Sequence, residues 1–99
     1  PILYDMEWVA MRFLDLLRSR YPKLLQERFK VTEQEYEGLE PFDLLELVGK
    51  KRGMMLSGGV VNTERAAITV LDEFRSGKIG RISLERPHTA AQTAVQEEV

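Results

Sequence analysis

The chain contains no cysteine and only one histidine, His88, among its 99 residues. Without cysteine there can be no disulfide, thiolate zinc site or cysteine nucleophile, and a reducing, cytoplasmic location is favoured. His88 stands in a polar stretch without a partner, so we expect neither acid–base catalysis nor metal binding from it. No apolar run approaches the roughly 18 residues of a membrane span. We therefore expect a cytoplasmic protein without a membrane partner.

Motifs of nucleotide-dependent and hydrolytic enzymes are also missing. The sequence contains no G-x-x-x-x-G-K-[ST], H-E-x-x-H or G-x-S-x-G. Glu33, Glu35 and Glu37 stand close together, but in a hydrophilic segment where nothing shifts a carboxyl pKa towards a catalytic value. An enzymatic function therefore ranks behind a binding or interaction function.

Apolar residues recur with helical spacing in four stretches. They predict helices over residues 6–20, 22–29, 41–52 and 63–76. Asp5 and Asn62 are suitable N-caps, and Gly53 can end the third helix in the left-handed conformation. Thr32 and Glu35 have the spacing of a capping box, so at most one helical turn is expected in the loop between the second and third helices. The predicted core consists of Phe13, Leu17, Leu25, Leu44, Val48, Leu71 and Phe74.

A chain of this length fits one domain, because two separate cores of half the size would not be stable. We expect residues 1–86 to form an all-α domain, a small bundle of about four helices with a short extended C-terminal segment over 79–84. Residues 87–99 offer little to bury and are expected to form a flexible tail. Because the chain starts at Pro1 and goes directly into a helical pattern, we expect it to be part of a longer protein.

Charge is distributed unevenly along the chain. Residues 50–86 hold eight Lys or Arg against four Asp or Glu, whereas residues 1–49 hold six against ten. The basic segment contains two glycine-punctuated clusters, Lys50, Lys51, Arg52 and Arg75, Lys78, Arg81. Four of these residues, 50–52 and 75, could simply oppose the dipole at a helix end. Lys78 and Arg81 lie beyond the helix end, so we expect the six residues to form an exposed phosphate-binding surface.

The first predicted helix has a second apolar face. Tyr4, Trp8 and Met11 fall on the side away from the core stripe. A helix with two apolar faces is covered on both sides. Either the three residues contact another domain, or Trp8 packs beneath the C-terminal segment of this one.

Several motifs occur together in the order found in one protein family. Arg12-Phe13-Leu14, Tyr21-Pro22, the K-R-G of 51–53, the S-G-G of 57–59 and the F-R-S-G-K-I-G-R of 74–81 resemble the C-terminal domain of ribosome biogenesis GTPase A, a circularly permuted GTPase of bacteria. The resemblance covers residues 3–86. The chain departs from the family at Met54, often cysteine, at Lys30, commonly glycine, and at 63–64, frequently an aromatic residue followed by Asp.

The resemblance implies an all-helical domain, likened in the family to the ANTAR fold, that helps the GTPase engage ribosomal RNA of the immature large subunit. It implies that GTP and magnesium bind an absent N-terminal domain, leaving this part without a cofactor or GTPase activity. The expected partners are ribosomal RNA of the large-subunit precursor and the GTPase domain. The alternative is a protein-interaction or regulatory module that docks on the GTPase domain or on a ribosomal protein.

Overall fold

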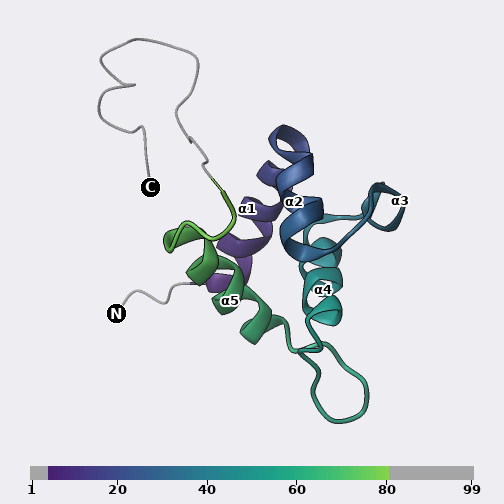
Figure 1. The fold of residues 1–99 in the computed structure, drawn as a ribbon. Helices are drawn as coiled ribbons and strands as arrows, with labels where there is room; N and C mark the ends of the chain where they lie inside the picture. The colour runs from purple at the N-terminus through teal and green to yellow at the C-terminus, as the bar shows by residue number, and fades with distance from the viewer. Residues whose placement is uncertain (1–4, 81–99) are drawn as a thin grey trace.

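The computed structural model describes residues 5–80, and within them the fold is all-α, as predicted (Figure 1). The helices are α1 (Met6–Arg20), α2 (Pro22–Phe29), α3 (Glu33–Tyr36), α4 (Pro41–Lys51) and α5 (Thr63–Arg75). The four longer helices agree with the predicted ranges to within one residue at each end. The only β pairing in this part of the chain is an isolated antiparallel bridge between Met55 and Val61.

Side-chain caps fix the starts of the helices. The Asp5 carboxylate accepts a hydrogen bond from the Trp8 backbone N–H at 3.1 Å, and the Asn62 side chain accepts one from the Arg65 N–H at 3.0 Å. The short helix α3 begins with the predicted capping box, in which the Thr32 and Glu35 side chains bond each other's backbone N–H. Each cap satisfies a donor that the helix itself leaves without a partner.

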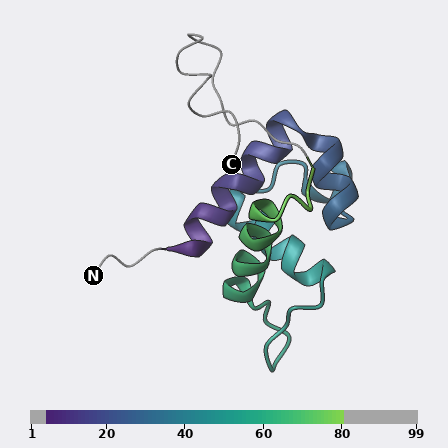
Figure 2. The same ribbon diagram turned by 60° about the vertical axis from the view of Figure 1, so that its left-hand side comes forward.

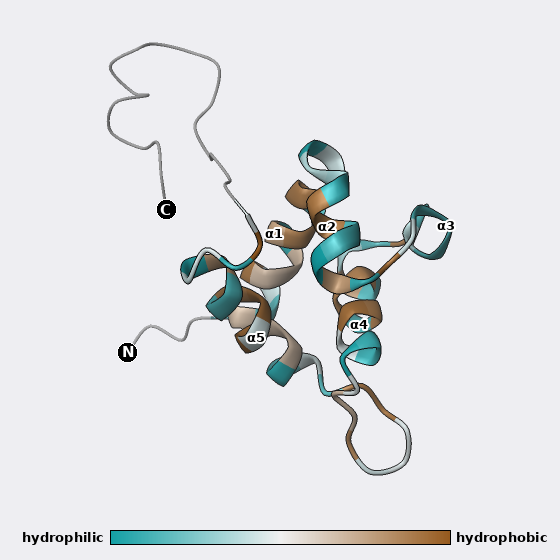
Figure 3. Ribbon diagram, in the orientation of Figure 1, coloured by the Kyte–Doolittle hydropathy of each residue, from teal (hydrophilic) through white to brown (hydrophobic). Residues whose placement is uncertain are grey.

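Between α4 and α5 the chain makes a hairpin, defined here as residues 54–61. The Leu56 N–H donates to the Val60 carbonyl and the Asn62 N–H donates to the Met54 carbonyl, both at 2.7 Å. The hairpin extends away from the helices in both ribbon views (Figures 1 and 2). Much of it has hydrophobic colouring (Figure 3), an unusual property for a protruding loop.

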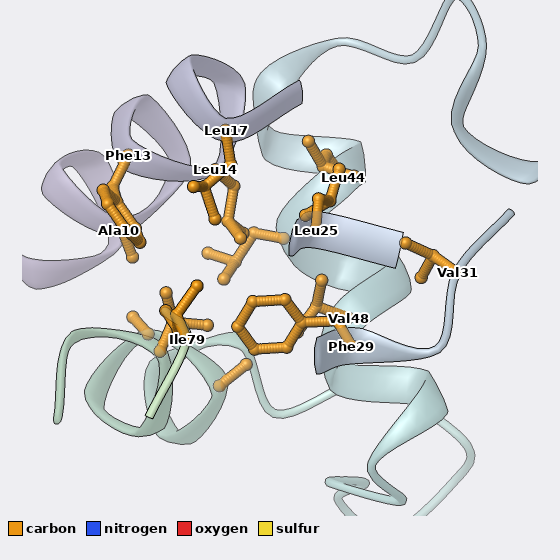
Figure 4. Close-up of a cluster of buried hydrophobic side chains, with 14 of the residues drawn as sticks. Ala10, Phe13, Leu14, Leu17, Leu25, Phe29, Val31, Leu44, Val48 and Ile79 are labelled. Atoms are coloured by element: carbon orange, nitrogen blue, oxygen red, sulfur yellow. The ribbon is translucent and has the colours of Figure 1, made fainter. Parts of the chain in front are cut away.

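The core lies between α1 and the helices that contact it, α2, α4 and α5. Its largest fully buried side chains are Phe29, Leu14, Leu17, Leu25, Leu44, Leu45, Val31, Val48 and Val70. The Phe29 ring lies in the middle of the cluster, beside Val48 (Figure 4). The predicted core is confirmed except at Phe74, which is only partly buried and packs at the margin, 4.3 Å from Phe13 between ring centroids.

After α5 the chain turns back towards the bundle. Gly77 adopts φ 78°, and Ile79 is 5% exposed and packs in the core, so the beginning of the predicted extended segment contacts the helices as expected. Its continuation at residues 81–84, the predicted tail at 87–99, and the candidate residues Tyr4 and Arg81 lie outside the described residues.

Among the residues that follow helices with a positive φ, Gly53 is expected from the sequence and Lys30 carries a side chain. Gly53 ends α4 with φ 72°, as predicted, whereas Lys30 ends α2 with φ 58° and ψ 42°. A side chain at such a position costs free energy that glycine avoids. This explains why glycine suits the position that Lys30 occupies.

Helix α4 approaches α5 closely at Gly49. A Cβ atom on this buried glycine would lie 2.8 Å from Val61 Cγ1 and 3.1 Å from Ala66 Cβ. Because those distances leave no room for a side chain, Gly49 sets how closely α4 and α5 pack.

In the part of the chain that the structure describes, no helix is both long enough and apolar enough to cross a bilayer.

Candidate nucleic-acid interface

Glu73 is the only buried charged residue between 5 and 80, with 7% of its surface exposed. It lies in the last turns of α5, seven residues after Ala66 and three after Val70, on the face of the helix that packs inward. A buried carboxylate is tolerated only when it is paired and hydrogen-bonded.

Two arginines supply that pairing. Arg52 donates from Nη1 to Glu73 Oε2 at 2.8 Å and from Nη2 to Oε1 at 3.0 Å, while Arg28 donates from Nε to Oε1 at 2.8 Å. We call Glu73, Arg28 and Arg52 the Glu73 hub. Arg28 belongs to the last turn of α2, and Arg52 is the C-cap of α4. One carboxylate therefore ties the end of α5 to the ends of two other helices.

Arg52 makes further contacts that fix its position. Its Nη2 donates to the Arg28 carbonyl at 3.3 Å, and its guanidinium lies 5.2 Å from the centroid of the Phe29 ring. A planar guanidinium can bind a carboxylate through two donors while stacking on an aromatic face, which a lysine ammonium cannot do.

Pairing between Glu73 and the arginines shifts the pKa values of Glu73 and Arg52, and the hub as a whole carries a net positive charge. Hydrogen bonds from Arg52, and next from Arg28, outweigh the effect of burial and lower the pKa of Glu73 to about 2. The same pairing raises the pKa of Arg52. The carboxylate is therefore ionised at neutral pH, and the two guanidiniums leave one positive charge in excess.

The hub brings the two predicted basic clusters together. Arg52 belongs to the first cluster, and its partner Glu73 precedes Arg75 of the second cluster by two residues. The Glu73 carbonyl also accepts a hydrogen bond from the Lys78 N–H at 3.0 Å. Segments separated in sequence by the hairpin and α5 are therefore neighbours in the structure.

The predicted site residues differ in how they are placed. Lys50, Arg75 and Lys78 are exposed and make no ion pair within the described residues. Lys51 pairs with Glu35 of the α3 capping box at 2.6 Å, and this pairing lowers the pKa of Glu35. Arg52 does not lie on the exposed face as expected, because the hub holds its guanidinium against Glu73 and Phe29.

Sequence reasoning missed Arg28, Lys30 and Glu73 as members of this region. Lys30 is exposed and directly follows Phe29, on which Arg52 stacks. The sequence does contain one indication for Glu73. It follows Ala66 and Val70 at helical spacing, and a carboxylate on a buried helix face predicts a cationic partner.

The second candidate face is only partly solvent-exposed. Trp8 is 54% exposed, with the Arg12 guanidinium 5.6 Å from its ring centroid. Met11 is instead half-buried and packs against the core, so of the described candidates Trp8 offers the larger free surface.

Comparison with known proteins finds bacterial relatives that the chain matches over part of their length. It is 34% identical to ribosome biogenesis GTPase A of Bacillus cereus over 85 residues, which is 86% of this chain and 27% of that protein. The same protein of Priestia megaterium is 34% identical over 90 residues, or 91% of this chain and 30% of that protein. This chain is a relative of ribosome biogenesis GTPase A. The predicted resemblance is therefore confirmed.

A third ribosome biogenesis GTPase A, from Thermotoga maritima, is 41% identical over 56 residues, which is 57% of this chain and 21% of that protein. No protein-family model matches the chain. The chain thus spans less than a third of the length of the ribosome biogenesis GTPase A proteins it matches.

Between residues 5 and 80, no three His, Cys, Asp or Glu side chains are grouped closely enough to hold a metal ion.

Proposed function

We propose that this chain is an RNA-binding accessory domain of a ribosome-assembly GTPase, contacting ribosomal RNA of the immature large subunit in the cytoplasm. Its relatives are named for ribosome biogenesis. The observation that carries the proposal is the Glu73 hub, which joins the basic ends of α2, α4 and α5 around one neutralised carboxylate.

Four exposed cations are candidates for phosphate contact: Lys30, Lys50, Arg75 and Lys78. Lys30, Lys50 and Arg75 each lie two residues from a hub member along the chain, and the Lys78 N–H donates to the carbonyl of Glu73. Because phosphate contacts are independent of base identity, they orient the domain on RNA without reading its sequence.

The aromatic residues close to the hub favour folded RNA over single strands. Phe29 is fully buried beneath Arg52, and Phe74 packs on Phe13. Neither ring is free to stack on an unpaired base, which is the usual way proteins hold single-stranded RNA. We therefore expect a structured RNA, recognised by its shape and its phosphates.

The test compares two sets of substitutions that remove equal charge. The first variant replaces Lys50, Arg75 and Lys78 by Ala, and the control replaces Arg20, Lys23 and Arg65, which are also exposed. Arg28, Lys51 and Arg52 are left unchanged because they are ion-paired. Fluorescence anisotropy measures binding to a labelled stem-loop of large-subunit ribosomal RNA at several salt concentrations.

Each phosphate contact contributes about 0.7–0.9 to the slope of log K against log salt, so the first variant lowers the slope by about two to three. The control leaves it close to that of the unchanged chain. Equal losses in both variants would mean that general charge, rather than this surface, attracts the RNA.

A second candidate function, docking on the GTPase domain, is favoured by the exposure of Trp8. We expect GTP and magnesium to bind the GTPase domain, and we expect this chain alone not to hydrolyse GTP. The GTPase part of the Bacillus cereus relative, added in trans, shifts Trp8 fluorescence to the blue if it covers the ring. An unchanged spectrum at saturating concentration argues against docking at Trp8.

A further inference from the structure

The hairpin of residues 54–61 exposes an unusual amount of apolar surface for a loop. Met55, Leu56 and Val60 are 41%, 52% and 58% exposed. Single exposed apolar residues are ordinary on protein surfaces, but a contiguous group on a protruding element marks an interaction site. The hairpin is also held in shape, since the two backbone hydrogen bonds of the Met55–Val61 bridge close it.

An open groove of about 560 Å³ lies where the hairpin meets α4. Its apolar lining includes Leu47 from the helix and Met55 and Val60 from the hairpin. Asp43 and Glu46, one turn apart on α4, add two carboxylates. Neither carboxylate forms an ion pair with another described residue.

We propose that this groove binds a basic protein segment, one whose apolar side chains enter between α4 and the hairpin while its Lys or Arg residues pair with Asp43 and Glu46. The assignment follows from charge complementarity, because two unpaired carboxylates beside an apolar surface attract a cationic, apolar ligand. The groove is distinct from the Trp8 face, which lies on α1.

The same chemistry disfavours RNA as the occupant. Asp43 and Glu46 repel phosphate, and the exposed hairpin residues Met55, Leu56 and Val60 have no ring on which a base could stack. Lys50 also lines the groove and stands two residues before Arg52 of the hub along the chain.

The probe is a fluorescein-labelled peptide of alternating leucine and lysine pairs. A serine–lysine peptide of equal charge and a leucine–glutamate peptide serve as controls. Binding is measured by anisotropy for the unchanged chain and for Met55→Ser with Val60→Ser, two groove-lining residues whose exposed side chains contribute little to folding. The matched apolar control is Ile68→Ser, because Ile68 is 48% exposed on α5, away from the groove lining.

A second pair of variants separates local from general charge. Asp43→Asn with Glu46→Gln removes the two carboxylates of the groove, whereas Glu64→Gln with Asp72→Asn removes the same charge from exposed positions on α5. Binding of the RNA stem-loop is measured for every variant. Failure of this proposal is thereby distinguished from failure of the proposed RNA-binding function.

We expect the leucine–lysine peptide to bind and both control peptides to bind weakly. Loss of two apolar anchors in the hairpin variant weakens binding by about tenfold or more, while Ile68→Ser has little effect. Neutralising Asp43 and Glu46 weakens binding and its salt dependence more than the α5 control does. None of these variants impairs RNA binding.

Several results would overturn the proposal. They are no binding of the leucine–lysine peptide, equal binding to the hairpin variant, or equal effects of the two charge neutralisations. Loss of RNA binding in the hairpin variant would assign the hairpin to RNA instead.

Discussion

Replacing Glu73 by Gln tests whether the buried hub stabilises the fold as its geometry implies. The substitution keeps the size of the side chain but removes the charge that Arg28 and Arg52 neutralise. The two guanidiniums, 34% and 25% exposed, then face each other without a counter-charge. Removing one partner of a buried ion pair costs more than never having made the pair.

The pKa of Glu73 gives the magnitude. A fall from 4.5 to about 2 on folding corresponds to about 3 kcal/mol of unfolding free energy at neutral pH. Because the folded carboxyl has the lower pKa, this stability is present above about pH 5. It is lost as the pH falls through 4.5 towards 2.

Urea unfolding followed by circular dichroism, at pH 7 and at steps down to pH 2, measures both effects. We expect Glu73→Gln to be less stable than the unchanged chain by about 3 kcal/mol at pH 7, with the gap closing in acid. Asp72→Asn is the matched control, since Asp72 is exposed and one residue away. The reasoning would be refuted if the free energies of unfolding of Glu73→Gln and of the unchanged chain differed by the same amount at every pH.

Three further predictions concern backbone and core. Lys30→Gly relieves the left-handed strain at φ 58° and raises the unfolding free energy by about 0.5–1 kcal/mol, whereas Lys30→Ala gives no such gain in the same urea titration. Gly49→Val lowers the thermal midpoint, because its side chain overlaps Val61 and Ala66; an unchanged midpoint would show that α4 and α5 can separate at no cost. Phe29→Ala costs about 3–5 kcal/mol, measured by urea unfolding, since the ring is fully buried; a loss below about 1 kcal/mol would contradict its central place.

The helices could be predicted from the sequence because their signals are local. Apolar spacing, the caps at Asp5 and Asn62 and the stop at Gly53 involve residues within one or two turns of each other.

The prediction placed Phe74 too centrally in the core, because helical spacing indicates which face of a helix is buried but not how far a neighbouring helix extends over it. At the end of α5 its ring packs against that of Phe13, and Phe74 as a whole is only partly buried.

The candidate site was less predictable because pairing in the hub depends on tertiary distance. Arg52 bonds a residue 21 positions away, and nothing in the K-R-G motif distinguishes this inward arginine from the outward Lys50. Lys51 is likewise paired only because α3 brings Glu35 beside it. Basic runs therefore indicate a charged region of the fold, while the structure decides which members remain free for a ligand.

The Glu73 hub also has a consequence for the rate at which the fold opens. The Arg28–Glu73 pair joins residues 45 positions apart, and it can form only after the ends of both α2 and α5 are in place. Contacts that require such long loop closure tend to form after the folding transition state, when the entropy of ordering the intervening chain has already been lost. Stabilisation gained after the transition state slows unfolding and leaves the folding rate nearly unchanged. We therefore expect the hub to slow unfolding and so to prolong the lifetime of the folded helix ends on which the proposed RNA contacts depend.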